Sequence, residues 1–435
     1  MADAFTLTLA ADHVTPVRAY AALRSYAPHQ SSFLFESLDP GQRWSIVGYR
    51  AQGENLFPPG EKAFSQILEE MAPRAEAPSG LAERLSQASV GYIAYEAVHS
   101  IHSVESWEHQ GSLSRLMNNA TVALFDHQLH TVTIAGPSRG SVKRAAWEMT
   151  HGPELPQLSA PDPSVFPDYF DPMVEDTAFA ARLVRAQRYV EAGDVEHVVL
   201  ARTFLTSIRN ADPLDVYRAL RLLAPAPYLY FIEFGGTPFA PGVILAGSAA
   251  VPAVLHAAGD VAPDTAFKAS FPATAGTGTP RARALQIVRE LEHGARGLFG
   301  GAVGYILPDG SLTMAAPLHT LSFQDGQVEI TGSTVVRPGY EGDTTRRNIE
   351  PALAAVRAAQ DAATAREAAE ELRLARVAAK EQAEREKAER EKVESEKSGE
   401  SEQAASEKSG ESEQVASEQG GESEQAAPRG ESDQT

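Results

Sequence analysis

The sequence predicts a globular body of the α+β class, followed by a charged helix and then a disordered tail. Two observations carry this prediction. Before Asp361, segments rich in β-branched and aromatic residues alternate with segments whose apolar residues recur at helical spacing. From Asp361 onward, alanine and charged residues dominate. The chain has 435 residues and is 43% hydrophobic, enough for two domains or for one large domain with a sizeable core.

Composition excludes several classes of protein. The absence of cysteine excludes disulfides, thiolate nucleophiles and cysteine metal sites. The net charge of −20 argues against a nucleic-acid partner, because phosphate binding requires a basic face. No segment has the apolar length of a membrane span, and the N-terminus lacks the basic start of a signal peptide. We therefore expect a cytoplasmic enzyme or binding protein that contacts no membrane.

The first region, residues 1–150, combines strands with a helix. Apolar residues at helical spacing predict the helix over Gly60–Ala72. The predicted strands are rich in β-branched and aromatic residues; they are Ser31–Leu38, Ser89–Val98, Ala120–Gln128 and His130–Gly136. Residues 151–172 are rich in proline, which opposes both helices and strand ladders. We expect a linker there, between the first region and a second one over residues 173–360.

The second region alternates helices and strands. A helix begins with Asp176 as its cap and stops at Gly193, and another has Pro213 at its start. Residues 195–208 and 226–234 read as strands, and residues 242–261 as a hairpin. Residues 319–336 predict a strand pair around an Asp-Gly turn.

The C-terminal part divides into two segments. Residues 361–394 contain many acid–base pairs at i,i+4 spacing, which predict a solvated helix. Residues 395–435 contain a period-11 repeat that begins "SEKSGESEQAA" and has no aromatic residue. Such a segment cannot bury enough apolar surface to offset the entropy of ordering, so we expect disorder.

The most suggestive functional pattern lies in "FPATAGTGTPRARALQIVRELE", which starts at Phe271. Gly276, Thr277 and Gly278 precede a predicted helix for which Thr279 is the expected cap. A helix start with free N–H groups attracts anions, and Arg281 adds a positive charge. By itself a glycine loop before a helix is more often a plain turn, and this spacing fits neither the P-loop nor the dinucleotide fingerprint.

The surrounding motifs extend the pattern over residues 5–358. They include "SSFLFESLDPGQRWSIVGYRA", "SVGYIAYEAV", "YVEAGDVEHVVLARTF", "APYLYFIEFG", "ILAGS" and "RGLFGGAVGYILPDG" in that order. This series resembles the chorismate-utilising enzymes, and most closely the large subunit (component I) of anthranilate synthase. The resemblance implies two stacked antiparallel sheets flanked by helices, and a role in aromatic amino-acid biosynthesis.

The resemblance also implies sites and partners. Residues expected to face chorismate are Gly276, Thr277, Gly278, Arg281, Tyr305, His319 and Gly332. Residues that fall where regulated members bind tryptophan are Glu36, Ser37, Pro227 and Tyr228. For Ser37 and Tyr228, ordinary strand packing is the alternative. The family uses Mg²⁺ held by glutamates, and anthranilate synthases work with a glutamine amidotransferase subunit.

This chain departs from the family pattern in its acidic residues. A block that carries one metal-binding helix is replaced by residues 257–270, which have about the length of one loop. Where the second metal helix should carry glutamates, Arg346 and Arg347 stand, and only Glu341 or Glu350 can be brought near by shifting the alignment. We therefore assign no metal ligand and expect no cofactor in this chain.

Two histidines occupy further family positions. His319 stands where the family has an arginine for a substrate carboxylate. His197 stands where anthranilate synthases have glutamine and isochorismate synthases a catalytic lysine. His197 is thus a candidate general base, with a strand histidine satisfied by a neighbour as the alternative.

These features leave three hypotheses for function. The first is an anthranilate synthase component I-like protein with weak or no lyase activity. The second is a regulatory or binding paralogue that has abandoned catalysis and binds tryptophan, chorismate or a glutaminase subunit. The third is a nucleotide or phosphate binder that uses the glycine loop.

Overall fold

Two antiparallel sheets, of twelve and six strands, form the framework of the protein. The computed structural model describes residues 4–37, 43–60, 62–74, 76–102, 104, 112–237, 240–249, 254–257, 262–317 and 319–415. In spatial order the larger sheet contains β1 (Phe5–Ala10), β8 (Thr131–Gly136), β7 (Thr121–Asp126), β3 (Trp44–Tyr49), β2 (Ser32–Ser37), β11 (Tyr228–Phe234), β12 (Val243–Ala249), β17 (His319–Gln324), β18 (Gln327–Val336), β10 (His197–Ser207) and β14 (Gly278–Thr279), with β9 (Asp171–Pro172) paired to β10. The smaller sheet contains β13 (Val254–Ala257), β16 (Leu312–Ala315), β15 (Ala302–Ile306), β5 (Ser89–Ile93), β6 (Ser114–Asn118) and β4 (Gly53–Phe57).

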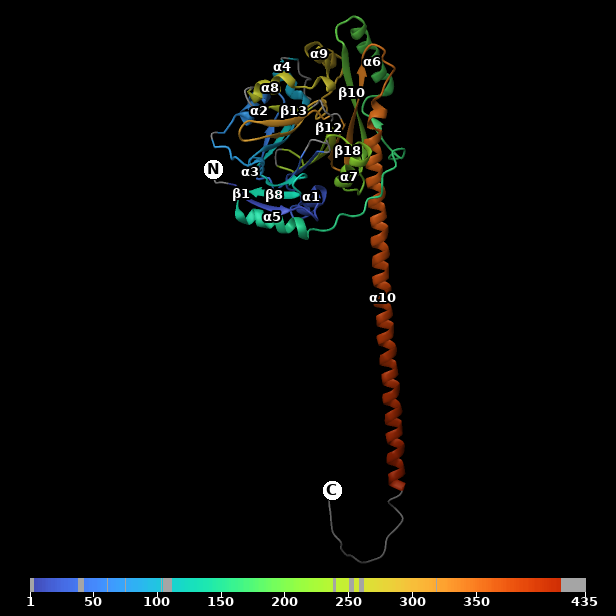
Figure 1. Cartoon of the computed structure of the whole chain (residues 1–435). Helices are drawn as coiled ribbons and strands as arrows, with labels where there is room; N and C mark the ends of the chain where they lie inside the picture. The colour runs from blue at the N-terminus through green and yellow to red at the C-terminus, as the bar shows by residue number, and fades with distance from the viewer. Residues whose placement is uncertain are drawn as a thin grey trace, which may run out of the picture. The chain divides into compact units, whose positions relative to one another are not determined.

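Helices cover the outer sides of this framework (Figure 1). The α-helices are α1 (Pro16–Ser25), α2 (Ala63–Met71), α3 (Leu81–Ser86), α4 (Val98–His102), α5 (Arg139–His151), α6 (Asp176–Glu191), α7 (Pro213–Leu223), α8 (Pro263–Ser270), α9 (Arg281–Leu291) and α10 (Thr345–Val415). Two 3₁₀ turns are η1 (Tyr95–Ala97) and η2 (Thr274–Gly276). These elements confirm the predicted α+β class.

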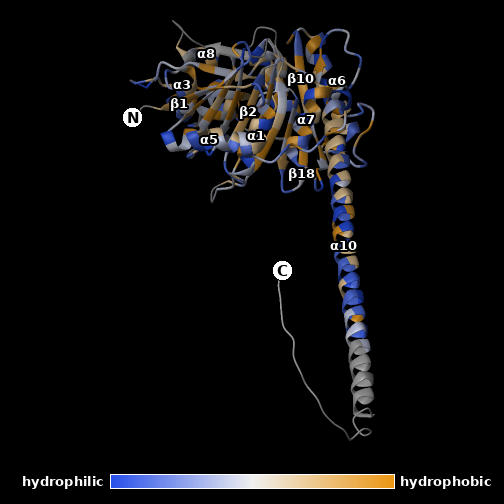
Figure 2. Cartoon of the chain, turned by 60° about the horizontal axis from the view of Figure 1, so that its bottom comes forward, coloured by the Kyte–Doolittle hydropathy of each residue, from blue (hydrophilic) through white to orange (hydrophobic). Residues whose placement is uncertain are grey.

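The two sheets pack face to face through apolar side chains. Phe33 and Tyr230 from the larger sheet share one cluster with Val90 and Val303 from the smaller sheet. Leu34, the residue after Phe33, joins a different cluster, with α1, α5, α7 and the start of α10. Successive strand residues face opposite sides, so both faces of the larger sheet are buried at this point. Figure 2 accordingly shows many apolar residues along the strands, while the helices carry both apolar and polar residues.

The proline-rich segment does not separate two bodies. Although residues 153–170 have no regular structure, strands from both sides of the segment pair with each other. In the larger sheet β2 pairs with β11, and in the smaller sheet β5 pairs with β15. Residues up to Thr364 therefore form one compact unit, rather than the two regions that the sequence suggested.

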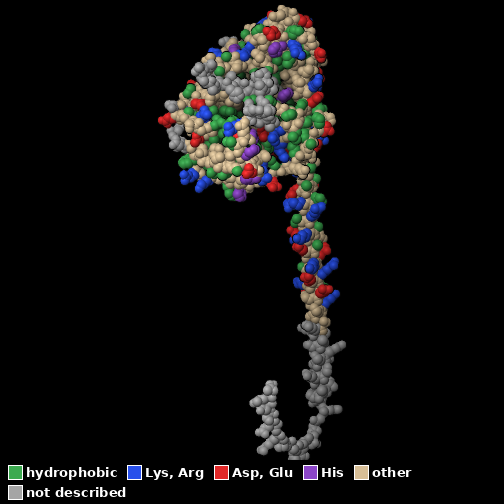
Figure 3. Space-filling view, viewed as in Figure 1, with side chains coloured by type: hydrophobic (Ala, Val, Ile, Leu, Met, Phe, Trp, Pro, Cys, Tyr) green, Lys and Arg blue, Asp and Glu red, His purple; other side chains and the backbone are tan. Residues whose placement is uncertain are grey.

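Helix α10 begins earlier and ends later than predicted. Its first turns bury Ile349, Leu353 and Val356 in the core, so the helix starts at Thr345 rather than near residue 361. Residues from Ala365 form a second unit, and over 367–399 their side chains are exposed. Figure 3 shows side chains of both charges interspersed along this helix. We expected disorder from residue 395, whereas the helix continues to Val415; residues 416–435 lie outside the described ones.

Two strand predictions need correction. The strand predicted over Ser89–Val98 ends at Ile93, because the chain then turns and the Tyr95 N–H donates to the Gly297 carbonyl (2.8 Å). The hairpin predicted over residues 242–261 is wrong, since β12 lies in the larger sheet between β11 and β17, whereas β13 pairs with β16 in the smaller one. The chain crosses from one sheet to the other between these two strands.

Three predictions at helix starts also need correction. Residues 257–270 are not only a loop, because α8 forms there and buries Phe267 against Phe271 (ring centroids 5.0 Å apart). Helix α9 begins at Arg281 with Pro280 as its N-cap, while Thr279 belongs to strand β14. The N-cap of α6 is Glu175, so Asp176 lies inside the first turn.

Among the helices that the structure describes, none combines the length and the apolar character needed to cross a bilayer.

Candidate functional site

The glycine segment (Thr274–Arg281) forms part of the larger sheet. Gly278 pairs with Val198 and Thr279 with His197, at the start of β10. The Thr277 carbonyl accepts a hydrogen bond from the Val199 N–H (3.0 Å). The structure thus brings His197 and the three predicted residues Gly276, Thr277 and Gly278 together; the backbone of Thr277 and Gly278 is used for pairing with β10, and Gly276 ends the turn η2.

Gly278 is required by this pairing rather than by a ligand. Its φ is +130°, a backbone conformation that residues with a side chain rarely adopt. A Cβ at this position would lie 2.4 Å from the His197 carbonyl oxygen. The close backbone approach that the glycine permits is therefore an approach to β10. This arrangement gives no support to the hypothesis of a nucleotide or phosphate binder that uses the glycine loop.

The guanidinium of Arg296 occupies the space beside the glycine segment. Its Nη1 donates to the Gly276 carbonyl and its Nη2 to the Val199 carbonyl, both at 2.7 Å. Nε and Nη2 also bind the two carboxylate oxygens of Glu292, at 2.7 and 2.6 Å. Both side chains are almost fully buried. Arg296 therefore ties the glycine segment, β10 and the end of α9 to one another.

Glu96 is a second buried acid in this cluster. Its Oε1 accepts the N–H groups of Arg296 (2.7 Å) and Gly297 (3.2 Å). Its Oε2 is buried and has no hydrogen-bond partner within the described residues. Burial raises the pKa of Glu96 to about 7, although the backbone N–H groups oppose this shift. This carboxyl can therefore be protonated near neutral pH.

Arg281 is held to helix α8 by one of its guanidinium nitrogens. Its Nη1 donates to the Ala269 carbonyl in the last turn of α8 (2.5 Å). Partial burial lowers the pKa of its guanidinium. The chain itself thus uses one donor of Arg281, while the buried Nε has no hydrogen-bond partner among the described residues.

His319 and Gly332 lie at other places on the larger sheet. His319 starts β17, opposite Ser248, and desolvation by nearby protein atoms lowers the pKa of its imidazole although the ring reaches solvent. A Cβ on Gly332 would lie 2.5 Å from the Thr345 carbonyl oxygen. Gly332 therefore lets the start of α10 pack closely on β18, and the space beside it is filled by backbone.

Asp343, which lies just before α10, forms an ion pair with Arg202. Arg202, which pairs with Gly332 in the sheet, is 4% exposed. Its guanidinium donates to Asp343 (2.7 Å), Asp176 (2.6 Å) and the Thr345 hydroxyl (3.0 Å). These bonds neutralise Asp343, at the place where the family pattern leads one to expect a metal helix.

The donor set around the glycine segment does not fit a magnesium ion. Mg²⁺ prefers carboxylate oxygens and water in an octahedral shell, whereas both oxygens of Glu292 are already bound by Arg296. Glu341 and Glu350, the acids that a shifted alignment could supply, are exposed. Within the described ranges, no three His, Asp or Glu side chains are grouped as a metal site requires.

The predicted regulatory residues meet Tyr305 in a cavity between the two sheets. This interior cavity, of about 80 Å³, is lined by Glu36, Tyr228 and Tyr305, among others, and the Phe35 and Tyr305 rings are 6.3 Å apart. Burial raises the pKa of the Tyr305 hydroxyl. None of the predicted residues of the glycine segment lines this cavity. Tyr305, expected beside chorismate, therefore lies with the regulatory set.

The other two regulatory residues are chain neighbours of residues that line this cavity. Ser37 pairs with Tyr228 through the backbone of β2 and β11, and Pro227 directly precedes β11. Glu36 itself is 5% exposed; its carboxylate accepts from the Tyr217 hydroxyl (2.6 Å) and pairs with Arg221 (2.9 Å).

Sequence reasoning missed four residues that organise these sites. They are Glu96, Arg296, Tyr217 and Arg221. The "YE" of "GYIAYEAV" and the "RG" of "RGLFGG" were visible in the sequence, but nothing local indicates that these two motifs meet. For Tyr217 and Arg221, the signal is a polar pair at i,i+4 spacing on one face of α7.

Comparison with known proteins identifies a matching family and several similar proteins. The family model described as chorismate binding enzyme matches residues 30–242 and 255–338. Anthranilate synthase component 1 of Streptomyces coelicolor is 26% identical over 461 residues, covering 81% of this chain and 88% of that protein. The Acinetobacter calcoaceticus protein of the same name is 24% identical over 440 residues, covering 74% and 87%.

A solved structure supports the fold. The crystal structure of anthranilate synthase component I from Streptococcus pneumoniae TIGR4 covers 82% of this chain and 99% of its own, with a TM-score of 0.56 at 16% identity. Two stacked antiparallel sheets with flanking helices are therefore confirmed.

Proposed function

Because the chain belongs to the family of chorismate binding enzymes, we propose that it is an anthranilate synthase component I-like protein with weak or no chorismate–pyruvate lyase activity. The observation that carries this proposal is the pairing of Glu292 with Arg296 beside the glycine segment. A metal-dependent lyase requires several carboxylates that are free to hold the ion. Of the two buried acids that the structure describes in this cluster, Glu292 is held by a cation of the chain, which leaves only Glu96 with an unbound oxygen.

Two further contacts support the proposal. The Gly276 carbonyl and the Thr277 carbonyl are engaged by Arg296 and by Val199, so this backbone is occupied by internal partners. Glu292 also accepts the Ala201 N–H (2.8 Å), which completes its hydrogen bonding without any ligand. Separating Glu292 from Arg296 while both side chains stay buried would leave uncompensated charges, at a cost of several kcal/mol.

The test is a direct assay of the full chain. Purified protein is incubated with chorismate, MgCl₂ and an ammonium salt, and anthranilate is followed by its fluorescence. The Streptomyces coelicolor relative serves as the positive control under identical conditions. A bound metal ion supplies several kcal/mol of charge stabilisation in the transition state. Loss of the metal site should therefore lower turnover by about 10³-fold or more relative to the control. Metal-dependent turnover within tenfold of the control would refute the proposal.

A second candidate function is a non-catalytic binding protein. The interior cavity favours it, because this cavity unites the predicted regulatory residues Glu36 and Tyr228. At about 80 Å³ it is smaller than the 300–1,000 Å³ of typical ligand pockets, so a ligand the size of tryptophan would require the sheets or the Trp44 side chain to move. Such a protein would keep a ligand or a glutamine amidotransferase partner without turning over chorismate.

Calorimetry separates the two candidates. The full chain is titrated with tryptophan and, separately, with chorismate, and it is mixed with a glutamine amidotransferase subunit in a pull-down. Binding of tryptophan that Tyr228→Ala abolishes would support the second function. Absence of binding to both ligands and to the subunit would exclude it, and the lyase assay would still decide the first proposal.

A further inference from the structure

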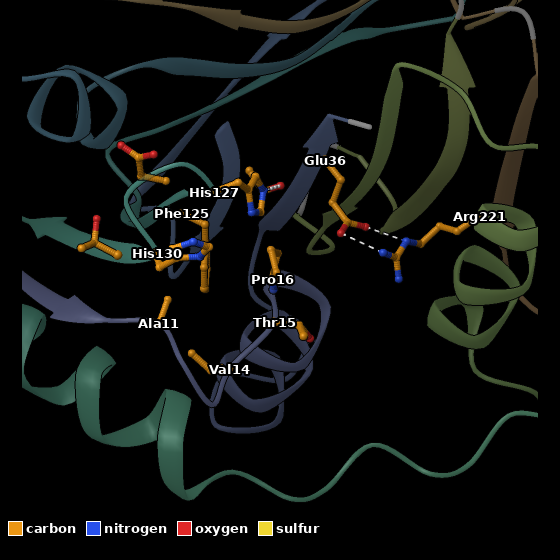
Figure 4. A pocket seen from close by; sticks show the side chains of 12 residues that line it. Ala11, Val14, Thr15, Pro16, Glu36, Phe125, His127, His130 and Arg221 are labelled. Atoms are coloured by element: carbon orange, nitrogen blue, oxygen red, sulfur yellow. Dashed lines mark hydrogen bonds and ion pairs between the residues drawn. The ribbon is translucent and has the colours of Figure 1, made fainter. Parts of the chain in front are cut away.

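A separate cleft lies on the larger sheet between α1 and α7. This α1–α7 cleft has a volume of about 420 Å³, within the range of pockets that hold small molecules. Its lining comes from the start of α1, the ends of β2 and β7, the start of β3, the β7–β8 turn and the last turn of α7 (Figure 4). Of the sequence-predicted site residues only Glu36 lines it, so it is distinct from the glycine segment.

Arg221 presents an unused hydrogen-bonding edge to this cleft. Its Nε and Nη2 lie 2.9 and 3.1 Å from the two carboxylate oxygens of Glu36. Its remaining nitrogen, Nη1, has no acceptor in the part of the chain that the structure describes. Figure 4 shows the third guanidinium nitrogen pointing away from Glu36. Arg221 is thus fixed by a buried acid and still has N–H groups to offer a ligand.

The two acids of the cleft do not oppose an anion. Glu36 is neutralised by Arg221 and by the Tyr217 hydroxyl. Asp126 pairs with Arg43, and its Oδ1 accepts two backbone N–H groups of the β7–β8 turn at 3.0 Å. The hydrogen bond from Arg43 is the main reason that the pKa of Asp126 lies below its ordinary value. Each negative charge therefore has its own cationic partner.

The rest of the lining consists of two histidines, hydroxyl groups and apolar side chains. His127 hydrogen-bonds to the Ser45 hydroxyl through Nε2 (2.7 Å), and His130 adds a second imidazole. Val14, Pro16 and Phe125 supply apolar surface to the same cleft. No metal-binding group of three His, Asp or Glu side chains occurs within the described residues, so imidazoles and carboxylates here do not form an ion site.

We propose that the α1–α7 cleft binds a small organic carboxylate with an apolar body, and that Arg221 anchors the carboxylate. The apolar wall would contact the body of the ligand, and the free guanidinium edge would donate to the anion. A charge-assisted hydrogen bond from an oriented arginine favours a carboxylate over its neutral amide. This inference is independent of whether the protein turns over chorismate.

The test compares a charged probe with its neutral isostere. The full chain is titrated calorimetrically with benzoate and with benzamide at pH 7.5. We expect benzoate to bind at least about tenfold more tightly than benzamide. Equal affinity for the two probes, or no benzoate binding at millimolar concentration, would overturn the proposal.

Variants localise the binding to the cleft. Arg221→Lys keeps a cation for Glu36 but removes the planar edge, so benzoate affinity should fall at least about tenfold. Arg218→Lys is the matched control on the same helix, because the Arg218 donors serve Asp215 (2.7 Å) and the Pro156 carbonyl (2.9 Å). Ala11→Leu narrows the cleft with apolar bulk, without changing any charge, and should also weaken binding. Wild-type benzoate affinity in Arg221→Lys or in Ala11→Leu would refute the assignment.

Discussion

The buried pair of Arg296 and Glu292 provides the sharpest prediction about stability. Replacing Arg296 by Met removes five N–H donors but keeps most of the side-chain volume. Four of the lost hydrogen bonds are the ones to Gly276, Val199 and Glu292. The Glu292 carboxylate, 4% exposed, would then be buried without a cation. Breaking a buried pair from one side costs about 3–5 kcal/mol, and we expect Arg296→Met to lose that much unfolding free energy.

The assay is urea unfolding followed by circular dichroism at pH 7.5. The matched control is Arg185→Met, because Arg185 pairs with Glu290 on the same helix α9 and both side chains are about half exposed. Exposed pairs contribute about 0–1 kcal/mol, so the control should change little. A loss below about 1 kcal/mol at pH 7.5 would refute this account of the cluster.

Two further predictions concern residues of the same cluster. The pKa of Glu96 in the folded protein is raised to about 7, above its value in the unfolded chain. The folded state therefore binds the proton more tightly between about pH 4.5 and 7, and the free energy of unfolding should fall as the pH rises through that window. Glu96→Gln should remove this slope and be more stable than wild type at pH 8 by about 1–3 kcal/mol in urea unfolding, whereas an unchanged slope would contradict the burial effect. Gly278→Ala should cost at least about 2 kcal/mol, because its Cβ would lie 2.4 Å from the His197 carbonyl at a φ of +130°. Gly53→Ala, with nothing within 4 Å of the new Cβ, is its control, and equal thermal shifts in the two variants would contradict the steric argument.

Several local elements could be read directly from the sequence. The turn at Asp325–Gly326 joins β17 and β18 as the Asp-Gly pair predicts, and both residues have positive φ. Pro213 stands at the first position of α7, and the Asp212 side chain caps the helix by accepting the Leu214 N–H (2.9 Å). In each case the residues that decide the element are within a few positions of one another.

The candidate site was predictable only in part. The resemblance to a known family brought Gly276, Gly278 and His197 forward, and the structure places them together. It also assigned Tyr305 to the substrate, which stays a prediction; the fold places Tyr305 in the cavity that Glu36 also lines. A residue on a strand faces one of two sides, and which neighbours it meets there depends on how the sheets stack.

By itself, then, the sequence determined the class of fold, most local elements and the departure of this chain from the acidic pattern of its family. The tertiary structure decided which partners each charge received. The Glu96–Arg296 contact joins residues 200 positions apart, and the Glu36–Tyr217 contact joins residues 181 apart. Helical and strand periodicities act over about ten residues, so no local pattern can specify such contacts. They form because a charge buried between packed sheets must find a partner wherever along the chain that partner lies.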